Sequence, residues 1–546
     1  MRSSKLLFAG LALIVAAGCG GGKNRGAGFD EDQLSSDPNP GGSNPFGGGQ
    51  FGGDVSKNLA LDPLNATVII DTAANPIVAG SVTYKVLKQG QDLSAGAQFS
   101  LKDPSLGSFS GAKFTSIASL PAGVLGKSTT VQAQTAEGQV LGTLTVVALR
   151  KTGTSRDFFF VVPYNELPTP KSDVLKFSTN IKQADVAFSM DTTGSMGGAI
   201  DNLKTSLQTT LMTQLQAAIP NVGLAVVDFK DFPWSGISDP WVVQVRQSIT
   251  TNLTLAQNAV GAMSASGGGD GPEASIASMQ FILDGQANSG IPGHANTVPG
   301  TFGGVDFRAG SVPVVVNITD VDWHDPSGTA TMATLKAAYA ATKAKFVAVS
   351  EGSIETPANE LSDATGSNVP PAAFGAGCTP GQCCTGLNGA ARAPTGPGGT
   401  CRLNFLSSSG SGVGSSVVKA ISAIAVGTTF DVKAQASNDP KNAKNVDATK
   451  FIKAIRAMDE GNPAEGCPAA PAKDSDGDGI KDTFLAVKAG TPVCFEVIAA
   501  TNTTVTPTID PQFFNAFIDV MGLPGNLKLD TRTVLFLVPP TVSGVK

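Results

Sequence analysis

Residues 184–196 read ADVAFSMDTTGSM, an apolar stretch that leads directly into Asp191, Thr193 and Ser195. The apolar part predicts a buried β-strand, and the polar run after it predicts a loop at the end of that strand. One carboxylate and two hydroxyls at alternate positions of a tight loop can direct their oxygens towards one point. Mg²⁺ prefers such oxygen ligands and keeps several waters. Because two of the three donors are neutral, a bound ion stays electrophilic and can accept a carboxylate from another molecule.

Strand and helix patterns alternate after this loop. Residues 198–219 carry Ile and Leu at helical spacing, and 222–228 form a second apolar run that ends in an aspartate. Further strands are expected at 312–318 and 346–349, and further helices at 273–283, 331–343 and 413–425. This alternation predicts a parallel sheet with helices on both faces.

Acidic residues stand where the expected strands end. Asp191, Asp228 and Asp320 close three of the strands. A glycine-rich loop that contains Asp270 and Glu273 precedes one of the helices. Ligands of open α/β sheets bind at the edge where the strands end, so these residues are expected to share one site.

The order of four motifs resembles the von Willebrand factor A (VWA) domain and its metal-ion-dependent adhesion site. The motifs are D-T-T-G-S-M at 191–196, V-V-D at 226–228, D-G-P-E-A at 270–274 and I-T-D at 318–320. They look closer to the I-like domain of integrin β subunits than to the plain A domain, since that domain has D-x-S-x-S-M, F-V-D, D-x-P-E-x and T-T-D in this order. The resemblance covers residues 184–427 and implies a VWA domain there.

The resemblance implies two metal sites. The ligands of a Mg²⁺ or Mn²⁺ ion would be Asp191, Thr193, Ser195, Glu273 and Asp320. An adjacent Ca²⁺ site would use Asp228, Asp270, the Pro272 carbonyl and Glu273.

The chain also departs from the integrin pattern in two places. Gly198 and Ala199 replace two acidic residues, so the inhibitory neighbouring metal site is not expected. Gly268 replaces an asparagine, which leaves the adjacent Ca²⁺ site one ligand short.

Helix capping is the alternative explanation for several of these residues. Thr193, Ser195 and Glu273 precede helices, where such side chains satisfy free N–H groups and complement the helix dipole. For any one of these residues alone, helix capping explains the pattern as well as a metal site does. Four motifs that converge on one sheet edge favour the metal site.

The amino terminus has the pattern of a bacterial lipoprotein signal peptide, residues 1–18. Two basic residues precede an apolar core, and Ala16-Ala17-Gly18 lead to Cys19, which would carry the lipid. Ala16 stands where the motif prefers Leu, and ordinary secretion with a free Cys19 is the alternative. Gly20 after Cys19 resembles sorting to the outer membrane. We expect a lipid-anchored protein at the cell surface, with a periplasm-facing orientation left open.

Regions of different character flank the expected VWA domain. Residues 19–57 are rich in Gly, Pro, Asn and Ser and predict a flexible tether. Short alternating strands predict an immunoglobulin-like β-sandwich at 58–150. Residues 151–183 and 428–546 are expected to form a second sandwich into which the VWA domain is inserted, as the hybrid domain of integrin β carries its I-like domain. The fold class expected is therefore multidomain α/β plus all-β.

Six cysteines follow Cys19, and an even number in an exported protein favours disulfides over zinc. Four of them lie in a Gly/Pro-rich insertion, residues 370–404, and their connectivity stays open. Cys467 and Cys494 are expected to pair with each other. The six candidates are Cys378, Cys383, Cys384, Cys401, Cys467 and Cys494.

A second metal motif lies between the last two cysteines. Residues 474–482 read DSDGDGIKD, with acidic residues at alternate positions as in an EF-hand loop or a thrombospondin type 3 repeat. The Ca²⁺ ligands would be Asp474, Asp476, Asp478, the Ile480 carbonyl and Asp482. No helices of EF-hand type flank the loop, so a bound ion would serve to stabilise the loop itself. A solvated acidic turn without metal is the alternative.

Composition limits the function classes. The chain has 546 residues, enough for three or four domains, and a net charge of -6 that gives no electrostatic case for nucleic acid. Only two histidines are present, His294 and His324, so we expect no enzyme. His324 follows the proposed metal edge; a hydrolytic metal site is conceivable there, but a loop histidine is expected.

We expect an adhesin that binds a carboxylate of a protein or surface ligand through Mg²⁺. The alternative is an envelope assembly or gliding-motility subunit whose VWA domain docks a protein partner.

Overall fold

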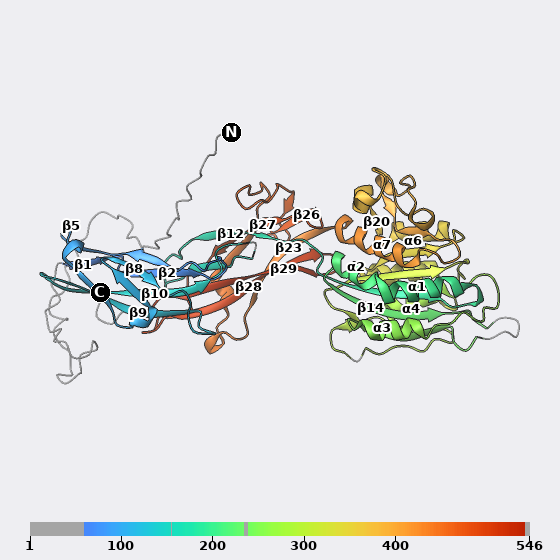
Figure 1. Ribbon diagram of the computed structural model, residues 1–546, viewed down its shortest axis with the longest axis horizontal. Coiled ribbons are helices and arrows are strands. Elements are labelled where there is room, and N and C mark those ends of the chain that lie inside the picture. Colours follow the sequence, from blue (N-terminus) through green and yellow to red (C-terminus); the bar gives the residue numbers. More distant parts are fainter. Residues whose placement is uncertain (1–58, 154, 234–238, 297, 541–546) are drawn as a thin grey trace.

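The computed structural model describes residues 59–540 except 154, 234–238 and 297. The chain forms two β-rich regions and one α/β region, and the α/β region lies at one end of the long axis (Figure 1). The fold is mixed α and β, as predicted. The expected signal peptide, Cys19 and the tether lie outside the described residues. In the described part of the chain, no helix is long and apolar enough to cross a membrane.

The α/β region is built on a six-stranded sheet in the order β15-β14-β13-β18-β19-β22. All pairs are parallel except β14 with β15, which is antiparallel. β13 and β18 lie in the middle and are buried along almost their whole length, as expected for strands covered on both faces. The strands are β13 (Gln183–Asp191), β14 (Asn221–Phe229), β15 (Val243–Thr250), β18 (Val312–Thr319), β19 (Lys345–Ser350) and β22 (Asn404–Leu406).

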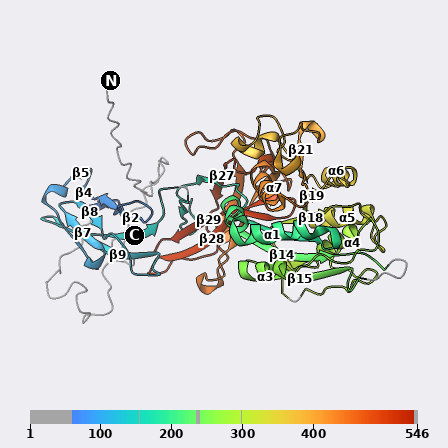
Figure 2. The same ribbon diagram turned by 45° about the vertical axis from the view of Figure 1, so that its right-hand side comes forward.

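Helices lie on both faces of this sheet (Figure 2). Alternate residues of β13 enter different cores: Val186 and Phe188 pack with α1, α2, α3 and α7, whereas Ala187 packs with α4, α5 and α6. The helices are α1 (Gly197–Thr209), α2 (Leu211–Ala218), α3 (Leu253–Gly261), α4 (Ser275–Asp284), α5 (Met332–Thr342), α6 (Glu355–Ala364) and α7 (Val413–Gly427).

Several details of the α/β region differ from the prediction, which named no helix at α3 or α6. The single helix expected at 198–219 is broken at Thr210, whose φ is -132°. The preceding Thr209 donates its hydroxyl hydrogen to the Thr205 carbonyl at 2.9 Å, a contact that tends to bend helices. The strands β15 and β22 were not predicted, because one is a half-exposed edge strand and the other has only three residues.

The β-rich region next to the α/β region contains strands that precede the α/β region in the sequence and strands that follow it. β11 (Phe158–Val161) pairs with β29 (Leu527–Val538), and β12 (Ser172–Phe177) pairs with β27 (Val493–Ala499). One sheet has the order β11-β29-β28-β23-β26-β25 and the other β12-β27-β24. The remaining strands are β23 (Thr429–Asn438), β24 (Ile452–Ala457), β25 (Ala472–Lys473), β26 (Thr483–Lys488) and β28 (Gln512–Leu523).

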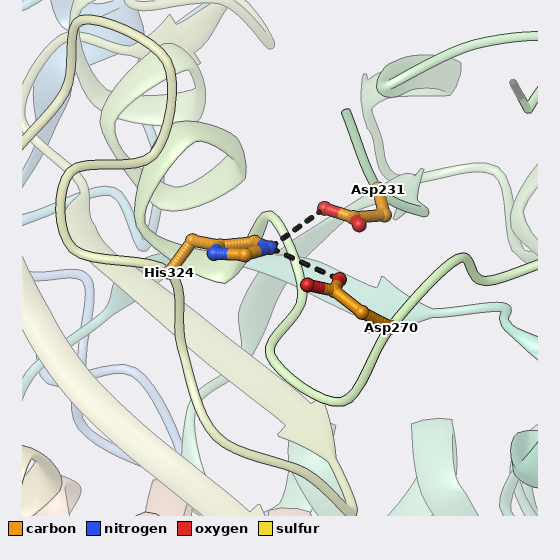
Figure 3. A group of neighbouring side chains, drawn as sticks. All are labelled: Asp231, Asp270 and His324. Carbon is orange, nitrogen blue, oxygen red and sulfur yellow. Dashed lines mark ion pairs between the residues drawn. The ribbon is translucent and has the colours of Figure 1, made fainter. Parts of the chain in front are cut away.

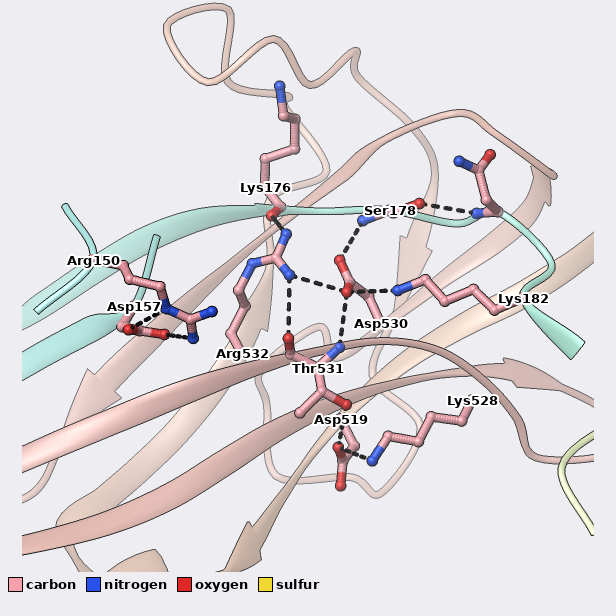
Figure 4. Close-up of polar contacts among 11 residues, drawn as sticks. Arg150, Asp157, Lys176, Ser178, Lys182, Asp519, Lys528, Asp530, Thr531 and Arg532 are labelled. Atoms are coloured by element: carbon pink, nitrogen blue, oxygen red, sulfur yellow. Dashed lines mark hydrogen bonds and ion pairs between the residues drawn. The ribbon is translucent and has the colours of Figure 1, made fainter. Parts of the chain in front are cut away.

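A polar network fixes the connection between this region and β13 (Figure 4). Asp530 of β29 lies 2.9 Å from the Lys182 ammonium and 3.0 Å from the Arg532 guanidinium, and it accepts a hydrogen bond of 2.8 Å from the Ser178 amide. Burial alone would raise the pKa of Asp530, but these three donors hold it below its ordinary value. The segment that enters the α/β region is therefore anchored on β29.

The amino-terminal β-rich region has its own core, which includes Tyr84 and Phe114. Its sheets have the orders β2-β10-β9-β6, β1-β4-β5 and β3-β8-β7. Val147 and Leu149 of β10 pack against strands of the next region. The strands are β1 (Leu59–Asp62), β2 (Asn65–Asp71), β3 (Ser81–Thr83), β4 (Lys85–Lys88), β5 (Gln91–Asp92), β6 (Gln98–Leu101), β7 (Gly107–Ser110), β8 (Lys113–Ser116), β9 (Gly126–Thr135) and β10 (Gly138–Leu149).

Three disulfides use all six cysteines of the described residues. Cys467 is bonded to Cys494, the pairing expected from the sequence. The other two bonds, Cys378–Cys384 and Cys383–Cys401, lie within the insertion between β19 and α7. They supply the connectivity that the sequence left open.

Candidate functional site

Asp191 is held at the carboxyl edge of the sheet by two threonines. Its side chain is fully buried at the end of β13. One carboxylate oxygen accepts hydrogen bonds from the amide and the hydroxyl of Thr193, at 2.8 and 2.7 Å. The other accepts a hydrogen bond of 2.7 Å from the hydroxyl of Thr319, the last residue of β18. Thr319 was not predicted as a site residue, although it directly precedes Asp320.

Glu273 lies beside this loop and is only 3% exposed. A Cβ placed on Gly268 would stand 3.1 Å from a Glu273 carboxylate oxygen and 3.0 Å from the Thr193 Cβ, so these three residues lie together. The Gly268 φ of +89° also favours glycine. The Gly194 amide donates to the Gly267 carbonyl at 3.1 Å, which joins the two loops.

Asp320 and Ser195 line one pocket of about 330 Å³ at this edge. The pocket is also lined by Glu351 and by Ser409, whose amide donates to Glu351 at 2.5 Å. One carboxylate oxygen of Asp320 is buried without a hydrogen-bond partner among the described residues, and the same holds for Glu273 Oε2.

Burial and mutual repulsion raise the pKa values of two of these carboxyl groups. Burial raises the pKa of Asp191 to about 6, and Asp320 adds to the shift, although Thr193 and Thr319 oppose it. Burial, with Asp191 and Asp231 nearby, raises the pKa of Glu273 to about 9. Carboxyl groups of this kind at a ligand-binding edge are candidates for function, because a cation would offset their repulsion.

The structure brings the five predicted Mg²⁺ ligands to one edge of the sheet. In the described residues, however, the carboxylate oxygens of Asp191, Glu273 and Asp320 are not all within 4.8 Å of one another. A Mg²⁺ ion that keeps several waters can reach such residues through those waters. The donor set would therefore suit a hydrated Mg²⁺ ion, whose positive charge would offset the repulsion between the three carboxylates.

The adjacent Ca²⁺ site is not assembled as expected. Asp228 is buried and pairs with the Arg246 guanidinium at 2.7 Å, so this carboxylate already has a counter-charge. Asp270 instead faces His324, at 3.3 Å. Asp228, Asp270 and Glu273 form no common group of carboxylates in the part of the chain that the structure describes. The prediction missed Arg246 because it lies on β15, the edge strand that the sequence did not reveal.

A buried lysine also holds the site loops together. Lys230 is 1% exposed and donates to the Thr192 carbonyl at 2.6 Å and to the Ser266 carbonyl. Burial lowers its pKa. Sequence reasoning missed Lys230, which carries no motif and is recognised only from its position under the two loops.

In the 474–482 loop, three of the five predicted ligands lie together. The carboxylates of Asp474, Asp476 and Asp478 can each place an oxygen within 4.8 Å of the others. Backbone amides of Gly477 and Gly479 donate to Asp474 at 2.7 and 2.8 Å.

Asp482, another predicted ligand of this loop, makes different contacts. Asp482 pairs with Lys433 at 2.9 Å and accepts hydrogen bonds from Ser475, so its carboxylate is already satisfied. The Ile480 amide donates to Asp478 at 2.7 Å. A cation would therefore meet three neighbouring carboxylates in this loop, each of which already accepts a hydrogen bond from a backbone amide.

No protein-family model matches the chain, and a search of curated proteins finds no match. Among solved structures, a von Willebrand factor type A protein from Catenulispora acidiphila is similar over 70% of this chain and 72% of its own, with 11% identity and a TM-score of 0.27. The pilus adhesin SpaC from Lactobacillus rhamnosus GG, in its open conformation, is similar over 67% of this chain and 45% of its own, with 12% identity and a TM-score of 0.27.

A second SpaC structure gives 72% and 51% coverage, 11% identity and the same TM-score of 0.27. This chain thus spans about half the length of the adhesin chains it matches.

Proposed function

We propose that the chain is a lipid-anchored surface adhesin whose α/β region binds a ligand carboxylate through Mg²⁺ or Mn²⁺. The ion would be held by Asp191, Thr193, Ser195, Glu273 and Asp320. One observation carries this proposal: Glu273 and Asp320 each keep a buried carboxylate oxygen without a hydrogen-bond partner in the described residues. A buried acceptor without a partner costs free energy, and a cation at this edge would recover it.

The pocket next to the site supports a role in binding. Ser195 and Asp320 line it, and about 330 Å³ is enough for a carboxylate side chain from a partner. When bound, the ion would supply a positive charge for that carboxylate. Ser195 and Asp320 would orient the ion, and the buried Asp191 would keep its place through Thr193 and Thr319.

The position of the site also suits a surface protein. Strand β13 begins beside Lys182, which pairs with Asp530 of the β-rich region, and ends at Asp191. The carboxyl edge of the sheet therefore faces away from the β-rich regions (Figure 1). We propose that these regions act as a sandwich-type stalk between the Cys19 anchor and the binding site.

Metal binding by the full mature chain tests the proposal. Removing the Asp191 carboxylate should weaken Mg²⁺ binding by at least about 100-fold, because Asp191 is the only charged residue of the 191–196 loop. Calorimetry measures this binding. Asp191→Asn keeps the size of the side chain, and circular dichroism checks the fold. Asp201→Asn is the matched control, since Asp201 lies on α1 with its side chain 81% exposed. Unchanged Mg²⁺ binding in Asp191→Asn contradicts the proposal.

Ligand capture then separates the two partner classes. In Mg²⁺ the wild type should bind matrix proteins, and excess EDTA should release it. Metal-dependent retention of envelope proteins from the same cells, with no matrix binding, would favour the assembly or motility subunit instead.

Cys19→Ser should move the chain from the membrane fraction to the soluble one, and continued membrane retention would reject the lipid anchor.

A further inference from the structure

Three side chains from separate segments meet beside the candidate Mg²⁺ site (Figure 3). Asp231 lies two residues beyond β14, Asp270 lies in the glycine-rich loop, and His324 lies in the segment after β18. His324 Nε2 is 3.2 Å from an Asp231 oxygen and 3.3 Å from an Asp270 oxygen. The ligand atoms of all three lie within 4.8 Å of one another.

Asp231 provides a second, independent indication of a ligand. The residue is only 2% exposed, and its carboxylate points towards His324 and Asp270 (Figure 3). Its Oδ1 accepts a hydrogen bond of 2.7 Å from the Phe232 amide. The same Oδ1 lies 3.2 Å from His324 Nε2, whereas Oδ2 is buried, accepts no hydrogen bond from an N–H or O–H donor of the described residues, and has the Asp270 carboxyl as its side-chain neighbour. Native proteins rarely leave such an acceptor unpaired.

An ion pair accounts for this arrangement less well than a metal does. Nε2 of a histidine carries one proton and donates it along one direction, yet two carboxylate oxygens lie at nearly equal distances from it. A cation between the three groups would satisfy both carboxylates and the imidazole lone pair together.

The spacing of the ligand atoms fits a small tetrahedral ion. Zn²⁺ binds His nitrogen and Asp oxygen at roughly 2.0–2.1 Å, which places two ligand atoms of a tetrahedron about 3.3 Å apart. The observed separations of 3.2 and 3.3 Å match this edge length. An imidazole ligand also selects Zn²⁺ and its transition-metal neighbours over Mg²⁺ and Ca²⁺, which prefer oxygen.

We propose that Asp231, Asp270 and His324 bind Zn²⁺ at a site separate from the Mg²⁺ site. Asp270 and His324 keep 29% and 27% of their side chains exposed, so an ion can enter from solvent. The fourth position would be taken by water.

The site joins the two loops that surround Glu273. The Glu273 amide donates to the Asp322 carbonyl at 2.9 Å, and the His324 amide donates to the Glu273 carbonyl at 3.0 Å. An ion on Asp270 and His324 therefore fixes the backbone on both sides of Glu273. This effect on Glu273 matters for ligand binding only if the proposed function holds, whereas Zn²⁺ binding itself does not depend on it.

Zn²⁺ titration of the full mature chain in excess Mg²⁺ and Ca²⁺ tests the assignment. Co²⁺ serves as a second probe, because its visible absorption reports a tetrahedral site with a nitrogen ligand. His324→Ala and Asp231→Asn should each weaken Zn²⁺ binding at least about 10-fold. His294→Ala is the matched control, since His294 is the other histidine and also lies 3.2 Å from an aspartate, Asp306.

The outcomes separate this site from the Mg²⁺ site. Asp191→Asn should retain Zn²⁺ binding even where it loses Mg²⁺ binding. His324→Gln, which keeps a polar side chain, provides a folded variant if His324→Ala unfolds, and it should also lose the Co²⁺ absorption. The assignment is overturned if the wild type does not bind Zn²⁺, if both His324 variants bind it unchanged, or if His294→Ala weakens binding equally.

Discussion

The two acidic loops of this protein shift the pKa of an aspartate in opposite directions. At the sheet edge, burial raises the pKa of Asp191 to about 6, with repulsion from Asp320. In the 474–482 loop, the amides of Gly479 and Gly477 lower the pKa of Asp474. The exposed loop therefore stabilises its charge with its own backbone, whereas the buried edge leaves part of its charge uncompensated. A run of acidic residues does not reveal this difference; burial and hydrogen bonding do.

Replacing Arg246 should cause the largest loss of stability, because Arg246 is the counter-charge of the fully buried Asp228. Arg246→Met keeps an apolar stem next to Trp241 but leaves Asp228 unpaired. The free energy of unfolding, measured with urea, should fall by about 3–5 kcal/mol. Adding Asp228→Asn should recover most of the loss. Lys336→Met, in an exposed pair with Glu360, should cost less than about 1 kcal/mol. Equal losses in the two single variants would contradict the difference between buried and exposed charge.

Stability without metal should depend on pH in the direction set by Glu273. The pKa of this group rises from 4.5 in the unfolded chain to about 9 in the folded one, so the folded protein binds the proton more tightly. Its contribution is fully present below pH 4.5 and is lost as the pH rises towards 9. In EDTA, the melting temperature should therefore fall by several degrees between these values.

Saturating Mg²⁺ should reduce that fall, because the ion stabilises the ionised carboxylates. Glu273→Gln should reduce this fall in melting temperature without metal. Glu351→Gln is the control, since Glu351 is an exposed glutamate that lines the same pocket. A melting temperature in EDTA that rises over the same pH range would show that Glu273 is not the dominant group.

The exposed loop should give the smallest effect. Ca²⁺ should raise the melting temperature of the full chain by a few degrees, because Asp474, Asp476 and Asp478 lie close enough to share an ion. Asp476→Ala and Asp478→Ala should remove the increase, and Asp510→Ala, an exposed carboxylate outside the loop, should not. Indifference to Ca²⁺ in all four proteins would make the loop an ordinary acidic turn.

The sequence revealed the α/β layout because strands buried on both faces are long apolar runs, as in Val312–Thr319. It also placed Asp191, Asp228 and Asp320 at the sheet edge, since each ends or directly follows such a run. The sequence could not show which residues from other segments of the chain contact the residues at the sheet edge. Arg246 lies on a half-exposed edge strand, Thr319 looks like part of a core strand, and Asp231 is distant in sequence from His324. Their roles follow from packing alone.

The double connection of the α/β region has a mechanical consequence. The chain enters this region through residues 178–182, held on Asp530, and leaves it at Thr428, after which β23 pairs with β26 and β28. A ligand attached at the carboxyl edge would pull on two covalent paths that end in the same β-rich region. Each path would carry part of the load, and the paired strands would resist it along their length. If the chain is anchored as proposed, tension would then reach the carboxyl edge of the sheet without separating the α/β region from the β-rich region.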